Sequence, residues 1–272
     1  MSYVLTLSCP DRPGLVYAVT RWIAESGGNI VDSQQFTDTS DGEFFLRVHF
    51  DHADPPDFSP VADEHSMDFR MVVAERPTRA LVMVSTEGHC LNDLLYRQST
   101  GGLHIEIPAV VSNHRDLEKL AGSYDVPFHH VPVTDKPAAE AKLLALVDEL
   151  EIDLVVLARY MQILSDEACR ALGGRAINIH HSFLPSFKGA RPYQQAHDRG
   201  VKLIGATAHY VTADLDEGPI IDQGVLRVDH RMTAADLARA GRDVESRTLS
   251  RAVQLHAESR VLRNGPRTVV FD

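Results

Sequence analysis

Continuous apolar segments separated by helical patterns constrain the fold of this chain more than any other feature. Residues 80–85 and 154–157 are apolar at almost every position. A strand without a polar side is expected where both of its faces are covered, as in a parallel sheet with helices on each side. The full alternation predicts strands at 80–85, 105–112, 126–133 and 154–157, with helices at 90–98, 115–123 and 137–150. Residues 77–272 are therefore expected to form a doubly wound, mostly parallel, Rossmann-like α/β domain.

The first 76 residues follow a different pattern, in which strands outnumber helices. Alternating apolar positions predict strands at 2–9, 30–37, 43–50 and 69–74. Residues 15–23 have apolar side chains near 3.6-residue spacing, which predicts a helix after the first strand. Three prolines between residues 52 and 67 leave room for only a short second helix. We therefore expect a separate N-terminal domain at 1–76, joined to the second domain by a linker near 75–78.

The N-terminal order β-α-β-β-α-β resembles the ACT domain, as do Asp11-Arg12-Pro13-Gly14 at the first strand-to-helix turn and Gly27-Gly28-Asn29-Ile30 after the helix. The resemblance implies a ferredoxin-like fold that pairs side by side with a second copy and binds a small amino acid at the glycine-bearing turn. Gly14, Asn29 and Ile30 would then form a regulatory site, and the protein would be a homo-oligomer. A simpler interpretation is that Gly14 opens a helix and Gly28 ends one.

Charge and hydropathy exclude several classes of partner. The formal net charge is −11, whereas binding to nucleic-acid phosphates requires a basic surface. Apolar runs stay far below the roughly 20 residues that span a bilayer, and the N-terminus lacks the pattern of a signal peptide. We therefore expect a soluble, cytoplasmic protein that binds neither nucleic acid nor membrane. The three cysteines, at positions 9, 90 and 169, are too far apart to suggest a disulfide framework or a zinc site.

A short alternating segment in the second domain brings two reactive side chains together. In Ile177-Asn178-Ile179-His180, a strand would turn both isoleucines to one face and Asn178 and His180 to the other. A second strand is expected at 204–211, followed by an acidic turn that contains Asp216. Open α/β sheets place active sites at the carboxyl ends of their strands, so we expect Asp216 to lie near His180.

An amide, an imidazole and a carboxylate suit the transfer or hydrolysis of an acyl group carried on nitrogen. Asn178 can donate a hydrogen bond to an oxyanion. His180 can donate or accept a proton near neutral pH. Asp216 can orient the imidazole, favour its cationic form or accept a proton from water. The alternative is that these are strand-end polar residues whose hydrogen bonds are satisfied by loop backbone.

Three motifs resemble the formyltransferase catalytic domain that uses 10-formyltetrahydrofolate: Asn-x-His-x-Ser-Phe-Leu-Pro from residue 178, His-Tyr-Val-Thr from residue 209, and Leu-Asp-x-Gly-Pro-Ile from residue 215. The resemblance spans about residues 78–272 and implies that Asn178, His180 and Asp216 are catalytic. It also implies a pterin-binding surface, although some of its positions are equally suited to the core. The residues of this surface are Leu157, Met161, Gln162, Ile163, Leu164, Val211, Thr212, Ala213, Asp214 and Leu215.

The doubled histidine at 180–181, the Lys-Gly-Ala-Arg-Pro-Tyr run at 188–193 and the ACT-like module together are most similar to the family of formyltetrahydrofolate deformylases. That family transfers the formyl group to water, giving formate and tetrahydrofolate for one-carbon and purine metabolism. Relatives that formylate glycinamide ribonucleotide carry a glycine- and serine-rich phosphate loop after the first strand of the domain. Here Glu87 and His89 occupy that place and make a poor phosphate cradle. The resemblance implies no cofactor, because the formylated folate is the substrate.

Three other functions compete with hydrolysis. A formyltransferase with an amine acceptor would use the same residues and differ only in what receives the formyl group. A metal hydrolase is suggested by the 14 histidines, but adjacent strand residues such as His180 and His181 point to opposite faces and do not chelate one ion easily. An amino-acid sensor with an inactive second domain is disfavoured because all three catalytic positions are filled.

Overall fold

The computed structural model describes residues 1–185 and 192–272. It divides into two compact units, one formed by Met1–Pro77 together with Glu258–Asp272 and the other by Thr78–Ala257. The chain passes from the first unit to the second after Pro77, one residue later than the boundary expected after residue 76. The other end differs from the expectation, because residues from Glu258 onward pack with the first unit although we had assigned them to the second domain.

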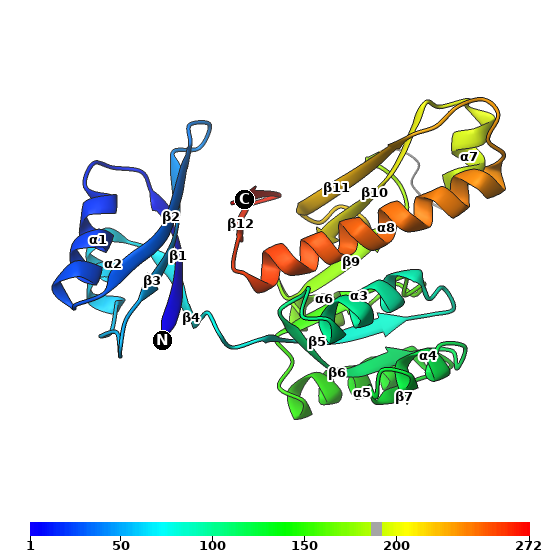
Figure 1. Ribbon diagram of the computed structural model, residues 1–272, viewed down its shortest axis with the longest axis horizontal. Coiled ribbons are helices and arrows are strands. Elements are labelled where there is room, and N and C mark those ends of the chain that lie inside the picture. The colour runs from blue at the N-terminus through cyan, green and yellow to red at the C-terminus, as the bar shows by residue number, and fades with distance from the viewer. Residues whose placement is uncertain (186–191) are drawn as a thin grey trace. The chain divides into compact units, whose positions relative to one another are not determined.

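The first unit is a four-stranded antiparallel sheet with two helices (Figure 1). The sheet order is β2-β3-β1-β4. Apolar side chains of both helices, including Val19 and Ala62, pack against sheet residues such as Phe50 in one buried cluster. This arrangement confirms the predicted βαββαβ order. The elements are β1 (Ser2–Pro10), α1 (Leu15–Glu25), β2 (Asn29–Asp38), β3 (Glu43–Asp51), α2 (Ser59–His65) and β4 (Asp68–Val73).

A C-terminal hairpin of β12 (Val261–Asn264) and β13 (Arg267–Val270) completes this unit. The buried Arg47 of β3 donates a hydrogen bond to the carbonyl oxygen of Glu258 over 3.0 Å. Arg267 lies 2.9 Å from a carboxylate oxygen of Asp38. The first unit is therefore built from two segments of chain that are separated by the whole of the second unit.

The second unit contains a seven-stranded sheet in the order β11-β10-β9-β8-β5-β6-β7. The five strands from β9 to β7 along this order pair in parallel, which confirms the doubly wound prediction. The strand expected at 126–133 is observed only at 128–130. The elements are β5 (Thr78–Val84), α3 (His89–Ser99), β6 (Ile105–Ser112), α4 (Glu118–Gly122), β7 (Phe128–His130), α5 (Lys136–Glu149), β8 (Leu154–Leu157), α6 (Asp166–Ala171), β9 (Ala176–His180), α7 (Pro192–Asp198), β10 (Leu203–Tyr210), β11 (Ile220–Arg227) and α8 (Ala234–Ala257).

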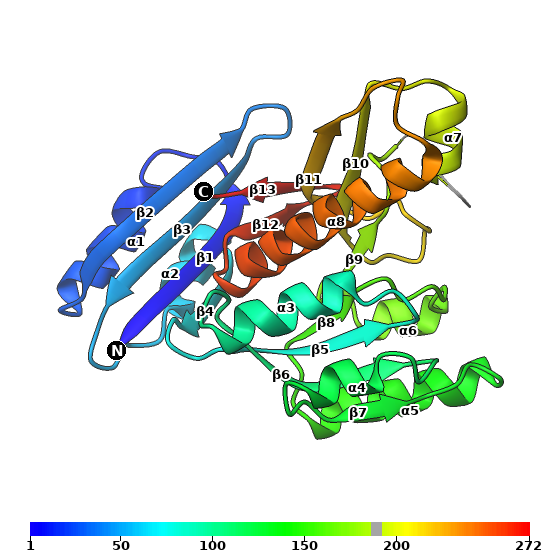
Figure 2. The same ribbon diagram turned by 45° about the vertical axis from the view of Figure 1, so that its right-hand side comes forward.

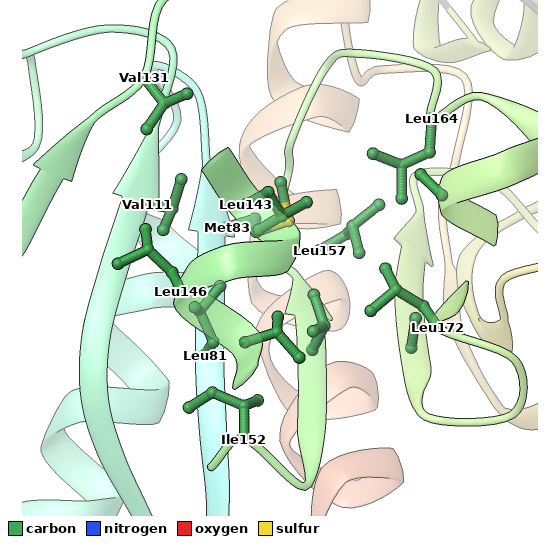
Figure 3. Packing of buried hydrophobic residues seen from close by; sticks show 14 of the residues in the cluster. Leu81, Met83, Val111, Val131, Leu143, Leu146, Ile152, Leu157, Leu164 and Leu172 are labelled. Atoms are coloured by element: carbon green, nitrogen blue, oxygen red, sulfur yellow. The ribbon is translucent and has the colours of Figure 1, made fainter. Parts of the chain in front are cut away.

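Helices cover both faces of this sheet, as the apolar strands require. On one face α8 packs over β9, β10 and β11 and lies beside α3 (Figure 2). On the other face, residues of α5 and α6 form a buried cluster with β5, β6 and β8. Figure 3 shows part of this cluster, from Leu81 and Met83 of β5 to Leu164 and Leu172. Leu157 at the end of β8 belongs to the same cluster, so the start of the β8–α6 loop is anchored to a closely packed core.

The last two strands run differently from the expected parallel arrangement. β10 pairs antiparallel with both β9 and β11, and His209 of β10 lies opposite Asn178 of β9. The end of β10 therefore does not share a carboxyl edge with β9, and our stated reason for placing Asp216 near His180 was wrong. The loop after β10 instead folds back over β9. Tyr210 closes that loop by donating its backbone N–H to the carbonyl oxygen of Pro219 over 2.9 Å.

Candidate active site

One cavity of about 490 Å³ lies beside β8 and β9 in the second unit. Its lining includes Asn178, His180 and Asp216, and every residue that we had expected to form the pterin-binding surface. Leu157 and Leu164 are buried at its floor, whereas Met161, Ile163 and Leu215 are more than half exposed. An apolar cavity with a few converging polar groups is the usual form of a small-molecule site. The cavity thus unites the predicted catalytic and binding positions.

His180 and Asp216 form a hydrogen-bonded pair in this cavity. Nδ1 of His180 lies 3.2 Å from Oδ2 of Asp216, and both side chains are largely buried. Because a carboxylate only accepts, Nδ1 of His180 must be the donor. Nε2 of His180 is buried and has no hydrogen-bond partner among the residues that the structure describes. The free Nε2 on a cavity-lining imidazole is positioned to bond a ligand.

Asp216 is held by an unusual backbone conformation. Its φ angle is 57°, in the left-handed region that asparagine, aspartate and glycine tolerate best. Two residues later, a Cβ on Gly218 would lie 1.7 Å from the carbonyl oxygen of Tyr210, so this position has room only for glycine. The hydrogen bond from His180 lowers the pKa of Asp216 and outweighs burial, which acts in the opposite direction. The carboxylate is therefore ionised at neutral pH.

His209 fixes the orientation of the Asn178 amide. Its Nδ1 lies 2.9 Å from the carbonyl oxygen of Tyr210, so Nδ1 carries the proton. Burial lowers the pKa of His209, which keeps this imidazole neutral and leaves its Nε2 as an acceptor. Nδ2 of Asn178 lies 3.2 Å from that Nε2 and donates to it. The second hydrogen of the same amide nitrogen is then available to a ligand oxygen.

Arg159 and His181 form the wall of the cavity next to His180. Arg159 has a φ angle of 66°, and its guanidinium donates to Nδ1 of His181. Burial, followed by the charge of Arg159, lowers the pKa of His181 to about 4. Because Nδ1 accepts from an arginine, which cannot act as an acceptor, His181 is neutral here and its proton is on Nε2.

The depressed pKa of His181 predicts a pH dependence of folding stability. Between about pH 4 and pH 6.5 the unfolded chain binds a proton at this imidazole that the folded protein does not, so stability should fall as the pH falls through that range. His181→Gln should remove up to about 1.4 kcal/mol per pH unit of that dependence. Urea unfolding of both proteins between pH 7 and pH 5 measures it. Equal slopes for the two proteins would contradict the assignment.

Sequence reasoning overlooked several residues of this site. His209 begins the His-Tyr-Val-Thr motif, but we had assigned it no role. Its position opposite Asn178 could be found only once β10 was known to be antiparallel to β9. Arg159 lies two residues after the end of β8, and this position was a usable signal for a residue at the edge of the sheet. The run at 188–193 lies mostly outside the described residues, and of it only Pro192 and Tyr193 are described.

Comparisons with known proteins fit this architecture. The family model of the formyl transferase domain matches residues 78–253, and that of the ACT domain matches residues 3–58. The formyltetrahydrofolate deformylase of Corynebacterium sp. strain P-1 is 51% identical, over 99% of this chain and 98% of its own length. The crystal structure of a formyltetrahydrofolate deformylase from Pseudomonas syringae pv. tomato superposes with a TM-score of 0.96 at 46% identity, covering 100% of this chain and 94% of the other.

The chain belongs to the formyltetrahydrofolate deformylase family. Proteins named as transferases match less of it: the glycinamide ribonucleotide transformylase 1 of Symbiobacterium toebii covers 72% of this chain, with a TM-score of 0.68 at 33% identity. The comparisons therefore favour a deformylase over a formyltransferase with an amine acceptor. Within the deformylase, the first unit is the ACT domain and the second unit is the formyltransferase domain.

The expected regulatory residues of the deformylase lie at opposite ends of the ACT sheet and remain predictions as a ligand site. β2 begins at the end where Ser2 pairs with Asp51, whereas Gly14 follows Pro10 at the other end of β1. Gly14 caps the N-terminus of α1 with a φ angle of 98°, and Asn29 and Ile30 begin β2. Gly28, just before them, packs so closely that an added Cβ would lie 2.8 Å from a side-chain carbon of Ile23. These positions agree with the expected turn geometry. They agree equally with the simpler interpretation that the glycines open and end a helix.

Proposed function

We propose that this deformylase hydrolyses 10-formyltetrahydrofolate with Asn178, His180 and Asp216 as its catalytic residues. The observation that supports the proposal best is the hydrogen-bonded His180–Asp216 pair, which lines the same cavity as Asn178 and the apolar residues expected to bind the pterin. The full-length similarity to deformylases supports water as the acceptor. The reaction would return formate and free tetrahydrofolate to one-carbon and purine metabolism.

In the first chemical step, Asp216 holds a water molecule and accepts one of its protons as the oxygen attacks the formyl carbon. Asp216 is suited to this because its Oδ2 accepts from His180, while its Oδ1 is 3.8 Å from the nearest imidazole nitrogen of His209. The carbonyl becomes an oxyanion, which the free hydrogen of the Asn178 amide and Nε2–H of cationic His180 stabilise. These donors act in a largely buried site, where hydrogen bonds to a developing charge are strong.

In the second step, the bond between carbon and N10 breaks and His180 gives its Nε2 proton to N10. The products are tetrahydrofolate and formic acid. The acid ionises, Asp216 releases its proton to solvent and Nε2 of His180 takes one up, so that one net proton is released in each cycle. This sequence needs no redox partner, and we expect no cofactor.

The remaining lining residues bind the pterin in this proposal. Leu157, Leu164 and Val211 form an apolar floor and wall, while backbone groups of the 161–163 and 211–215 segments meet the polar edge of the ring. The backbone N–H of Met161 is fixed because it donates to Oγ of the buried Ser85 over 3.0 Å.

A small amino-acid effector at the ACT domain and a homo-oligomer remain predictions. None of the described helices is long and apolar enough to span a membrane; a cytoplasmic location and the absence of nucleic-acid and membrane partners are part of the proposal.

The direct test is to incubate the purified protein with 10-formyltetrahydrofolate alone. We expect formate and tetrahydrofolate to appear in equal amounts, because water is the second substrate. Formate is measured by a coupled dehydrogenase assay and tetrahydrofolate by absorbance. The same reaction in the presence of a chelator should proceed at the same rate. A protein that releases formate only when an amine is added would overturn the proposal in favour of a formyltransferase.

A further inference from the structure

A buried carboxylate lies outside the catalytic cavity and has no part in the mechanism above. Glu245 is in the middle of α8 with only 1% of its side chain exposed. Nε2 of His89 lies 2.8 Å from its Oε2, and the hydroxyl of Tyr193 donates to its Oε1 over 2.5 Å. Nε of Arg159 is 3.4 Å from Oε2. We call His89, Tyr193, Glu245 and Arg159 the closing cluster.

The closing cluster lies directly behind the cavity wall. Arg159 lines the cavity, whereas His89, Tyr193 and Glu245 do not. The ring of Tyr193 is 6.3 Å from that of His181, which is in turn 5.4 Å from the ring of His180. A continuous chain of side chains therefore leads from the catalytic imidazole to the turn between β5 and α3, where His89 begins the helix.

The other end of this chain is tightly packed and contains a second carboxylate. In the β5–α3 turn, Glu87 lies 3.7 Å from His89 and 3.2 Å from Arg242 of α8. A Cβ on Gly88 would lie 2.9 Å from a side-chain carbon of Leu117, so the turn is tightly packed. Two carboxylates at a helix N-terminus oppose the anion that such a terminus would otherwise attract. The turn is thus unsuited to the phosphate of a larger acceptor.

Packing around the closing cluster leaves little space for an acceptor. A Cβ on Gly241, one helical turn before Glu245, would lie 2.0 Å from the hydroxyl of Tyr193, so the tyrosine lies flush against α8. Burial raises the pKa of Glu245, but the hydrogen bond from His89, the charge of Arg159 and the Tyr193 hydroxyl outweigh it and hold that pKa below its ordinary value. The carboxylate is ionised and neutralised by its own neighbours.

A metal ion is a weaker interpretation of the same residues. Potential ligand atoms of His89, Cys90 and Glu245 lie within 4.8 Å of one another. A cation there would have to displace Nε2 of His89 from Glu245 and approach the guanidinium of Arg159, which is already beside the same carboxylate oxygen. Burial also raises the pKa of the Cys90 thiol, so this residue is a poor thiolate ligand. The closing cluster is better described as a partition, that is, a packed group of side chains between the cavity and the β5–α3 turn in which the charge of Glu245 is neutralised by its neighbours.

We infer that the closing cluster determines the acceptor, because it fills the route from the formyl carbon to the β5–α3 turn and leaves water as the molecule that can attack. This inference rests on the proposed function. In a protein whose partition is opened, a primary amine attacks the formyl carbon, the bond to N10 breaks, and the proton lost by the amine reaches N10 through His180. The products are then an N-formyl amine and tetrahydrofolate.

The test compares Tyr193→Ala with Tyr193→Phe in the full-length protein. Alanine removes the ring and opens the partition, whereas phenylalanine keeps the ring and loses only the bond to Glu245. Each protein is incubated with 10-formyltetrahydrofolate and glycinamide, and formate, N-formylglycinamide and tetrahydrofolate are quantified. We expect the ratio of N-formylglycinamide to formate to rise at least ~10-fold over wild type in Tyr193→Ala and to stay near the wild-type ratio in Tyr193→Phe.

A Tyr193→Ala protein that releases tetrahydrofolate together with formate alone would overturn the inference. If this variant does not fold, His89→Ala opens the same partition from its other end and is read by the same ratio. Formate release by the wild-type protein in the same assay distinguishes a failure of the proposed function from a failure of the role given to the closing cluster. Its absence would overturn the proposed function itself, whereas a wild-type product ratio in an open, active variant overturns only the role of the closing cluster.

Discussion

Replacing Asp216 by asparagine is expected to slow formate release by at least ~10³-fold while leaving folate binding nearly unchanged. Asparagine has the same shape, tolerates the left-handed backbone at this position and can still accept a hydrogen bond from His180. It cannot accept a proton from water, and it does not favour a cationic imidazole. Single-turnover formate release measures the loss, and titration with a non-hydrolysable folate measures binding.

The matched control for this substitution is Asp198→Asn. Asp198 ends the short α7 helix, and 63% of its side chain is exposed. Its loss should change the rate less than about twofold, because exposed ion pairs contribute little. An Asp216→Asn protein that keeps more than a tenth of the wild-type rate would show that water is activated by another group. A protein that loses folate binding together with turnover would make Asp216 a binding residue instead.

Gly218→Ala is expected to damage both stability and catalysis, although it adds a single methyl group. The added Cβ would lie 1.7 Å from the backbone oxygen of Tyr210, which has no side-chain freedom to move away. The loop must shift, at an expected cost of about 3 kcal/mol. A shift of about 1 Å in Asp216 relative to His180 should reduce the rate by a further ~10². Urea unfolding and steady-state formate release measure the two effects separately.

Gly122→Ala serves as the control for Gly218→Ala. Gly122 ends α4, and an added Cβ would meet nothing within 4 Å. It should change the free energy of unfolding by less than about 1 kcal/mol and leave the rate intact. Wild-type stability in Gly218→Ala would mean that the loop relaxes without strain. A normal rate in a destabilised protein would mean that Asp216 keeps its place when the loop moves.

The local patterns of this sequence were sufficient to predict most of the second unit. The apolar run at 154–157 coincides with β8, because this signal depends on neighbouring residues alone. The two-residue spacing of Asn178 and His180 places both on the cavity side of β9 for the same reason. The assignment of ten further lining residues came from family resemblance, since nothing in their spacing distinguishes a binding surface from a core.

Long-range pairings account for what the sequence did not show. Parallel and antiparallel strands have the same two-residue period, so the direction of β10 could not be read from its residues. Glu245 looks like any other acid on a long helix until the helix is packed, and its partners His89 and Tyr193 are 156 and 52 residues away. The C-terminal hairpin has four-residue strands, which are too short to give a periodic signal.

The division of the ACT unit between two chain segments has a consequence for the order of folding. During translation, residues 78–257 emerge completely before the C-terminal segment that contacts Arg47 and Asp38 has been made. The formyltransferase unit can therefore acquire its structure while the module synthesised first is still incomplete at the ribosome. Removing residues 258–272 would accordingly destabilise the ACT unit, most of which is distant in sequence, and spare the formyltransferase unit that immediately precedes the cut.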